Sequence, residues 1–362
     1  MKKLGLDVAI ISDPKNVTYL TGYLDYGATP VPTYLVLLRD GTDVLLTGER
    51  KADAVSEVFG DEVITFQNYH LGTRMVARPD LASTLLTPLV GRAEKVRKVG
   101  IESWHTPKVL LDSVQKAAPQ AIYIDLSKPL ESMRMTKDAD EVAAIKASCK
   151  LVDYAYSVAE SVATPGLSEV ELYAAVHQKV VEKAGGFRYF SGDFTTGKRS
   201  VDPGPSGAPT GLTLKKGDTL ILDLWTTTRG YWADTCRTFL IDATPTREQL
   251  HLYRVVEKAM KEGITKMKPG ATGGDVYRAV KKVMTDAGYS KLFAHHAGHG
   301  IGLDPWERPF LIPGSKDIIE EGMVLALEPG IYLEGIAGIR LENNYLVEKD
   351  GAVQLSKYPI GW

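Results

Sequence analysis

The feature that most limits how this chain can fold is an internal repeat in its C-terminal part. Pro165-Gly166 ends one predicted helix, and Pro269-Gly270 ends its counterpart 104 residues later. Each break is followed by a second helical pattern and then by an apolar strand, GDTLILD (217–223) or GMVLALE (322–328). The repeat predicts two copies of a helix–helix–strand–strand unit, related by an approximate two-fold axis. Three of the helices begin at predicted capping boxes: Asp138 with Glu141, Ser168 with Glu171, and Thr246 with Gln249.

The repeat also aligns four acidic residues in two pairs. Asp223 closes the apolar strand of the first copy, and Glu328 closes that of the second. Asp234 begins the segment DTCRTFLI and Glu342 begins the segment ENNYLVE, which correspond in the same way. A two-fold axis would therefore bring four carboxylates towards one centre.

Asp223 and Asp234 lie in a predicted buried hairpin, LILDLWTTTRGYWADTCRTF (220–239). A tight turn at Thr228-Arg229 would set them opposite or nearly opposite each other on one face, unless a bulge at Gly230 shifts the register. Ionised carboxylates so close together repel, and burial adds several kcal/mol per ion. Divalent cations could neutralise such a group, whereas one arginine could not. For any single acid, an ordinary salt bridge or turn remains the alternative.

The segment HHAGHGIGLD (295–304) offers a nitrogen donor to this centre. His299 lies between two glycines, where the backbone can approach other groups closely. A set of oxygen ligands with one imidazole suits manganese, cobalt or zinc, and bridging carboxylates imply two ions about 3.5–4 Å apart. Such a centre activates a shared water and polarises a carbonyl, which predicts hydrolysis of an amide or ester. The histidines outside this segment are isolated and predicted to be surface or core residues: His70, His105, His177 and His251.

Residues 1–126 show a different pattern, in which short strands alternate with helices. A hairpin turn is predicted at Asp40-Gly41. We place the domain boundary near 127–129, which gives an α/β domain over 1–128 and a second domain over 129–362. The overall fold class is mixed α/β (α+β): both domains combine helices and strands. The predicted strands are 6–11, 33–38, 43–47, 62–66, 98–103 and 121–126, and the predicted helices are 51–59, 80–90 and 108–118.

The bulk composition excludes several classes of protein. The contents of 44% hydrophobic and 24% charged residues are globular values, and a net charge of -2 gives no reason to expect a nucleic-acid partner. No apolar run approaches the roughly 20 residues that a membrane span needs. Asp7 and Asp13-Pro14 interrupt an N-terminus that otherwise resembles a signal peptide. Cys149 and Cys236 match no metal or redox spacing and are predicted to be buried. We expect a soluble, cytoplasmic protein without a membrane partner.

Several of these motifs together resemble the pita-bread metallopeptidases, the family of prolidase, aminopeptidase P, methionine aminopeptidase and the metal-free creatinase. The likeness runs over about 130–362, through ILDLWTTTRGYWADTCRTF, HHAGHGIGLD, MVLALEPGIYLEG and GIRLENNYLV. Residues 1–126, with PKNVTYLTGY, resemble the creatinase-type N-terminal domain, which methionine aminopeptidase lacks. The resemblance implies a pita-bread catalytic domain with internal two-fold duplication, and homodimers are common in the family.

The resemblance implies a role for each metal-binding position. Asp223 would chelate one ion, and Asp234 and Glu342 would bridge both ions. His299 and Glu328 would complete the second ion's ligands, and Glu328 would also carry protons for the attacking water. Because all five ligands are present, the metal-free creatinase branch is disfavoured.

Three further positions match family residues that do not bind the metals. His295 matches a histidine that contacts substrate near the scissile bond, and Tyr332 and Arg340 match a polar pair beside the metals. At two positions the chain departs from the family: Trp306 and Thr210 stand where active members usually carry histidines that help to position substrate. Losing such a donor typically costs a factor of about 100 to 1,000 in rate. The metal chemistry should survive, whereas substrate preference is open.

Three hypotheses for function remain. The first is an Xaa-Pro dipeptidase, whose substrate carries proline after the scissile bond and a free carboxylate that a cation must bind. Arg199 and Arg308 are candidates for that cation, and Trp306 is a candidate wall for the proline ring. The second is an aminopeptidase P acting on longer peptides. The third is a non-peptide hydrolase or lyase, or a metal-retaining binding protein. The sequence leaves open the physiological metal, the preferred Xaa residue and the oligomeric state.

Overall fold

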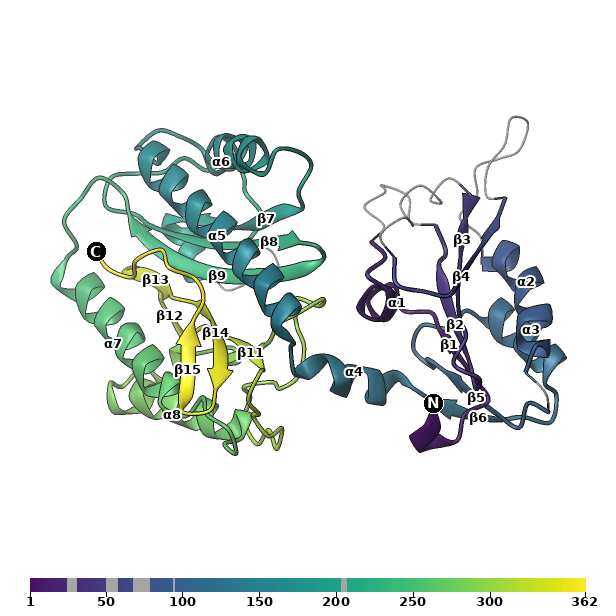
Figure 1. Ribbon diagram of the computed structural model, residues 1–362. Coiled ribbons are helices and arrows are strands. Elements are labelled where there is room, and N and C mark those ends of the chain that lie inside the picture. Colours follow the sequence, from purple (N-terminus) through teal and green to yellow (C-terminus); the bar gives the residue numbers. More distant parts are fainter. Residues whose placement is uncertain (25–30, 50–57, 68–78, 94, 203–206) are drawn as a thin grey trace. The chain divides into compact units, whose positions relative to one another are not determined.

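The computed structural model describes residues 1–24, 31–49, 58–67, 79–93, 95–202 and 207–362 (Figure 1). The chain divides into two compact units, Met1–Met133 and Arg134–Trp362. The division falls within helix α4 (Ser127–Met135), and the sequence-based boundary after residue 128 lies near the beginning of the same helix.

The first unit is built on a six-stranded mixed sheet in the order β4-β3-β2-β1-β5-β6. The β1–β2 and β2–β3 pairs are antiparallel, whereas the other three pairs are parallel. All six strands occur where the sequence predicts them, and the β2–β3 connection contains the predicted Asp40-Gly41 turn. The strands are β1 (Val8–Ile11), β2 (Tyr34–Leu38), β3 (Asp43–Gly48), β4 (Glu62–Phe66), β5 (Lys98–Ile101) and β6 (Ile122–Asp125).

The helices of the first unit are only partly those predicted. α2 (Pro79–Gly91) and α3 (Lys108–Ala117) confirm two predictions and pack on the apolar face of the sheet. The helix predicted over 51–59 falls largely outside the described residues. α1 (Pro14–Thr21) was not predicted from the sequence, although Asp13 caps it by accepting the backbone N–H of Lys15 at 3.0 Å.

The second unit contains the predicted repeat of helices and strands. The first copy consists of α5 (Ala139–Val162), α6 (Glu169–Ala184) and the antiparallel sheet of β7 (Phe190–Thr196), β8 (Thr219–Thr228) and β9 (Tyr231–Leu240). The second copy consists of α7 (Arg247–Ile264), α8 (Gly273–Asp286) and a sheet of β10 (Gly298–Gly300), β11 (Val324–Leu327), β14 (Asn343–Glu348) and β15 (Gly351–Gln354). A hairpin of β12 (Gly330–Leu333) and β13 (Ala337–Arg340) lies between β11 and β14 in the chain. Both copies therefore consist of two helices followed by strands, and each has more strands than the two that the repeat predicts.

Local capping explains where these helices begin. The three predicted capping boxes are present at the starts of α5, α6 and α7. A fourth box, formed by Thr272 and Asp275, begins α8. Each box satisfies backbone N–H groups that a helix start would otherwise leave without partners.

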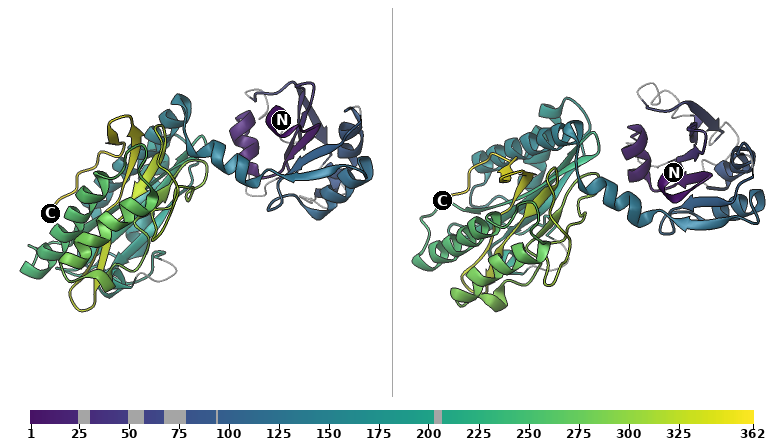
Figure 2. Two further views of the ribbon diagram at one scale, coloured as in Figure 1. Left: turned by 90° about the horizontal axis from the view of Figure 1, so that it is seen from below. Right: turned by 60° about the horizontal axis from the view of Figure 1, so that its bottom comes forward.

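Each copy has its own apolar core, and the two copies meet along β9 and β14. The pair α5–α6 packs on β7 and β8, and the pair α7–α8 packs on β11, β12 and β13, so that strands lie between the helix pairs (Figures 1 and 2). Cys236 and Glu342 exchange both backbone hydrogen bonds, at 3.3 and 3.0 Å. The Asn344 side chain adds two more to the backbone of Asp234, at 3.0 and 2.7 Å. The acids of the two copies are therefore held together by backbone pairing.

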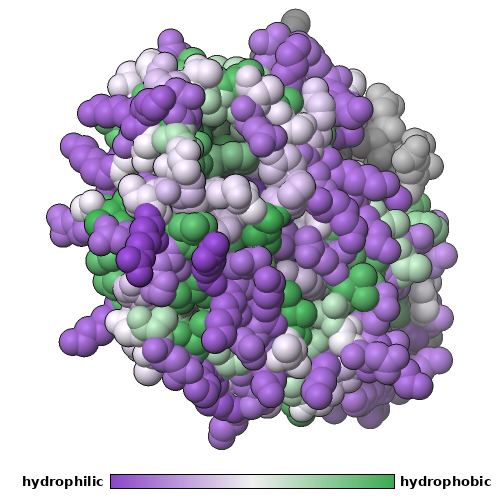
Figure 3. Space-filling model, turned by 90° about the vertical axis from the view of Figure 1, so that its left-hand side faces the viewer, coloured by the Kyte–Doolittle hydropathy of each residue, from purple (hydrophilic) through white to green (hydrophobic). Residues whose placement is uncertain are grey.

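Other sequence predictions concern the thiols and the surface. Cys149 and Cys236 are buried free thiols, as predicted. The face drawn in Figure 3 is mostly hydrophilic, with smaller apolar areas between the polar side chains. Within the described residues, the helices are all too short or too polar to cross a membrane.

Candidate metal centre

The β8–β9 hairpin carries Asp223 and Asp234 on one face, but in a register that differs from the predicted one. The turn is formed by Arg229 and Gly230, which both have positive φ, 53° and 81°. The predicted centre at Thr228-Arg229 is therefore wrong by one residue, because a two-residue turn of this kind needs positive φ at both positions. Asp234 pairs with Trp225, so that the two acids are diagonal rather than directly opposite neighbours.

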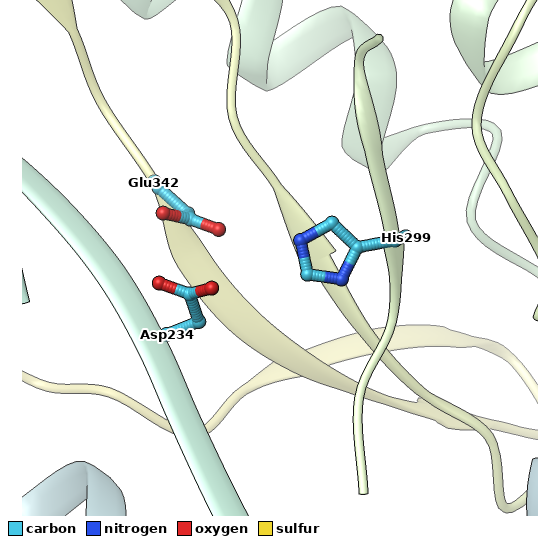
Figure 4. Close-up of side chains that lie close together, drawn as sticks. All are labelled: Asp234, His299 and Glu342. Atoms are coloured by element: carbon cyan, nitrogen blue, oxygen red, sulfur yellow. The ribbon is translucent and has the colours of Figure 1, made fainter. Parts of the chain in front are cut away.

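Asp234, His299 and Glu342 form the centre of the cluster. One ligand atom from each lies within 4.8 Å of the others, and all three residues are buried. Asp234 comes from β9, His299 from β10, and Glu342 directly precedes β14. In Figure 4 the two carboxylates face each other, and the imidazole approaches from the opposite side. The structure thus brings together ligands that are distant in sequence and come from both copies.

Glu328 extends this cluster from the end of β11. Its Oε1 lies 3.3 Å from Nε2 of His299. The other ring nitrogen of His299, Nδ1, is 2.9 Å from the carbonyl oxygen of Gly300. A hydrogen bond from Nδ1 to that carbonyl leaves Nε2 as the nitrogen available to a metal.

The buried carboxylates perturb one another's ionisation. Burial and the neighbouring carboxylates raise the pKa values of Asp234 and Glu342. Burial also raises the pKa of Asp223 to about 7, although Arg340 opposes the shift. The pKa of Glu328 is instead lowered to about 2, because the contacts with His299 and the nearby imidazoles outweigh the effect of burial. Without a cation, a fully ionised cluster would be strongly repulsive.

Three carboxylate oxygens of this cluster fit metal ligation. Oδ1 of Asp223, Oδ1 of Asp234 and Oε1 of Glu342 are buried and make no hydrogen bond with any described residue. Buried polar atoms normally have partners, so that such orphaned oxygens need an explanation. Carboxylate oxygens with an imidazole are ligands that divalent transition ions accept. The donor set therefore fits divalent metal ions.

A chain of polar contacts connects this cluster to His295. Nε of Arg340 lies 2.8 Å from Oδ2 of Asp223, and its Nη1 donates to the Tyr332 hydroxyl at 3.3 Å. That hydroxyl lies 2.9 Å from Nε2 of His295, whose burial lowers its pKa to about 4. The predicted placement of Tyr332 and Arg340 beside the acids agrees with these contacts. Sequence reasoning missed Asp193, which accepts from Nη2 of Arg340 at 2.6 Å and pairs with Asp223 across β7 and β8. The signal available was an acid within the strand-like segment FSGDFTT.

Thr210 and Arg199 belong to a separate network around Glu169. The carboxylate of Glu169 is fully buried and accepts the Thr210 hydroxyl at 2.6 Å and its backbone N–H at 2.9 Å. The guanidinium of Arg199 pairs with the same carboxylate. Sequence reasoning did not identify Glu169, since residues 169 and 210 are brought together only by the fold. Both predicted substrate contacts are thus engaged inside the protein.

Trp306 and Arg308 lie on the segment that follows β10. The Trp306 ring is 64% exposed and meets the His299 ring edge-on, at 6.4 Å between centroids. Arg308 donates from Nε to Asp317 at 3.1 Å. Trp306 therefore lies beside the cluster of acids and His299, with its ring exposed. The charge of Arg308 is balanced by a neighbouring acid.

Comparison with known proteins identifies the family of the chain. Residues 143–349 match the family model of metallopeptidase family M24, and residues 1–136 match the creatinase/prolidase N-terminal domain. The chain is 27% identical over 357 residues to the Xaa-Pro dipeptidase of Pyrococcus horikoshii, covering 99% of this chain and 94% of that protein.

Two solved prolidase structures resemble the whole chain. The prolidase of Pyrococcus horikoshii has a TM-score of 0.84 and 26% identity, covering 99% of this chain and 96% of that one. The prolidase of Pyrococcus furiosus has a TM-score of 0.82 and 25% identity, covering 99% and 98%. These matches confirm the predicted fold class, the enzyme class and the family resemblance. The chain belongs to the metallopeptidase family M24, with a creatinase/prolidase N-terminal domain ahead of its catalytic domain.

Proposed function

We propose that this protein is a two-metal Xaa-Pro dipeptidase. The observation that carries the proposal is the buried cluster of Asp234, His299 and Glu342, in which carboxylate oxygens lack hydrogen-bond partners among the described residues. An M24 metallopeptidase acts with divalent metal ions, and the similar Pyrococcus horikoshii protein is described as an Xaa-Pro dipeptidase. The bond cleaved would be the peptide bond before proline.

Five residues would hold the metals, by the roles that the family resemblance assigns. Asp223 would bind one ion, Asp234 and Glu342 would bridge both, and His299 and Glu328 would complete the other. When bound, divalent ions in such a site ease deprotonation of water and polarise a carbonyl oxygen. Manganese, cobalt and zinc all suit this donor set.

The protein's own residues would orient the substrate and hold the transferred proton. Glu328 has a depressed pKa and an oxygen that faces the imidazole of His299, so that its carboxylate is ionised at neutral pH, and the family resemblance gives it the role of proton carrier. The exposed Trp306 ring lies beside His299, where an apolar wall could meet the proline ring. Arg340 balances part of the acidic charge through Asp223 and Asp193.

A specific observation favours an aminopeptidase P as second candidate. A dipeptidase needs a cation for the carboxylate of its substrate, and Arg199 and Arg308 are paired with Glu169 and Asp317. This pairing weakens both as carboxylate clamps. An enzyme that acts on longer peptides would not need one.

A substrate comparison separates these functions. The protein would be stripped with a chelator, reloaded with Mn²⁺, Co²⁺ or Zn²⁺, and assayed with Ala-Pro, Ala-Pro-Ala and N-acetyl-Ala-Pro. The dipeptidase predicts release of proline from Ala-Pro, loss of activity on chelation, and slower cleavage of the tripeptide. Faster cleavage of the tripeptide would favour aminopeptidase P. No cleavage of any peptide at any metal loading would reject both.

A further inference from the structure

Arg237, on β9, is a buried cation whose hydrogen bonds all go to neutral groups. The residue is 3% exposed, and each of its five N–H groups has an acceptor. Nε donates to the carbonyl oxygen of Pro359 at 3.1 Å, Nη1 to those of Cys236 and Glu342 at 2.8 and 2.7 Å, and Nη2 to that of Tyr358 at 2.6 Å and to Oδ1 of Asn343 at 2.8 Å. None of these acceptors is a carboxylate. Burying a cation without an acid is costly, so that the arrangement of the five acceptors needs a reason.

Two of these hydrogen bonds join the strands that carry the proposed bridging ligands. Nη1 of Arg237 contacts the carbonyl oxygens of both Cys236 and Glu342, whose backbones are already paired with each other. Asp234 lies two residues before Cys236 on β9. Because side chains alternate along a strand, Arg237 projects from the face of β9 opposite to that of Asp234. The guanidinium thus holds the backbone of the carboxylate cluster from the side opposite the acids.

The other hydrogen bonds of Arg237 connect this backbone to the segment 355–362. Two backbone carbonyl oxygens of that segment accept from the guanidinium. The Ser356 hydroxyl donates at 2.8 Å to Oδ1 of Asn343, the same oxygen that accepts from Arg237. Asn343 directly follows Glu342 in the chain. The guanidinium is therefore the common partner of the segment and of the backbone that carries Glu342.

We propose that Arg237 is a positioning residue for the metal centre, because it holds the backbone of Glu342 against that of Cys236 and so orients the carboxylates for divalent ions. The inference rests on the proposed function, which takes Asp234 and Glu342 to be metal ligands. Arginine suits this role because its planar guanidinium presents five donors in a rigid fork, whereas lysine presents three donors at one point. Replacing such an outer partner of metal ligands typically lowers metal affinity by about 10- to 100-fold.

Metal binding by Arg237→Lys tests the inference. Lysine keeps the positive charge but cannot reach all five acceptors, so that Mn²⁺ affinity of the chelator-stripped protein should fall about 10- to 100-fold in titration calorimetry. Val176→Ala, in the fully buried core under α6, is the control for stability alone. It removes core volume and lowers stability without touching these contacts, and it should bind Mn²⁺ as native protein does. Urea unfolding of the chelated proteins would show how far each variant is destabilised.

The outcomes separate positioning from a general loss of stability. Native Mn²⁺ affinity in Arg237→Lys would overturn the inference, and so would an equal loss of affinity in Val176→Ala. If Arg237→Lys does not fold, Ser356→Ala decides, since it removes one hydroxyl from the same network. It should bind Mn²⁺ about two- to tenfold more weakly, and native affinity would reject the inference.

A failure of this inference can be told from a failure of the proposed function. If native protein binds no divalent ion, the proposed function fails and this inference with it. If native protein binds Mn²⁺ and releases proline from Ala-Pro, and Arg237→Lys binds Mn²⁺ equally well, only the inference is rejected.

Discussion

Oδ2 of Asp223 lies 2.8 Å from Nε of Arg340, while the other oxygen of the same carboxylate is buried without a hydrogen bond to any described residue. One oxygen of the Asp223 carboxylate thus contacts the guanidinium of Arg340, and the other oxygen is available to bind a metal. Arg340 also donates to Asp193 at 2.6 Å, so that one guanidinium serves two buried or half-buried acids.

Replacing Arg340 should destabilise the metal-free protein. Arg340→Met leaves Asp223 buried without its counter-charge, and breaking a buried pair in this way costs about 3–5 kcal/mol. Urea unfolding of the chelated protein measures the loss. Arg92→Met is the matched control, because its pair with Glu62 is exposed on both sides and should contribute little. Equal stability of Arg340→Met and the native protein would show that the contact with Asp223 does not contribute.

Trp306→His should change the reaction without affecting the metals. The ring is exposed beside His299, and an imidazole there would add a hydrogen-bond donor near the substrate. Since removing such a donor costs about 100- to 1,000-fold, adding one should raise kcat on Xaa-Pro peptides by about tenfold or more. Trp104→His, an equally exposed tryptophan of the first unit, should leave kcat as it is. A decrease in bound metal would instead assign Trp306 a supporting role for His299.

Replacing Glu307 should destabilise the segment that follows His299. Its buried carboxylate binds Lys137 Nζ at 2.8 Å and Arg134 Nε at 3.2 Å. Its backbone exchanges two 2.8 Å hydrogen bonds with Gly300. Glu307→Gln removes the negative charge that both buried cations contact, which should cost about 3 kcal/mol or more and weaken metal binding.

A double variant tests whether charge is the cause of that loss. Lys137→Met combined with Glu307→Gln removes one of these two buried cations and should recover part of the stability, as a double-mutant cycle would show. Strictly additive losses in chemical denaturation would contradict the ion-pair explanation.

The hydrogen bonds between Asp125 and Ser127 at the start of α4 should stabilise the protein at neutral pH but not at strongly acidic pH. Hydrogen bonds from Ser127 lower the pKa of Asp125 from 3.8 to about 2. Because the folded-state pKa is depressed, this contribution is present above the unfolded value and is lost as pH falls from about 4 to about 2. Unfolding of native protein and Asp125→Asn at several pH values should show a difference at pH 6 that vanishes near pH 2. Asp350→Asn, in an exposed turn, should show no such pattern.

Short-range patterns predicted much of the fold. Capping boxes located the starts of α5, α6 and α7, and alternating apolar residues located the strands of the first unit. The repeat indicated that the four acids would converge, and the segment HHAGHGIGLD indicated His299 as a nitrogen donor. The structure places Asp234, His299 and Glu342 together. These signals are local, or they repeat at a fixed spacing.

The remaining features depend on contacts that no local pattern carries. The hairpin register depended on positive φ at Arg229, a residue that rarely adopts it. Glu307 meets Arg134 across 173 positions of sequence, and Asp193 meets Arg340 across 147. The contact between His295 and Tyr332 depends on the position of the β12–β13 hairpin, which interrupts the repeat.

The most direct test of the central claim is the metal content of Asp234→Asn. The carboxylate of Asp234 is buried at the centre of the cluster and has an orphaned oxygen, so that its loss should remove a bridging ligand. Titration calorimetry with Mn²⁺, combined with elemental analysis and a proline-release assay, would compare the variant with native protein and with Asp242→Asn, an exposed control. The account predicts that Asp234→Asn loses bound metal and activity together while the control keeps both. Native metal content and affinity in Asp234→Asn would contradict it.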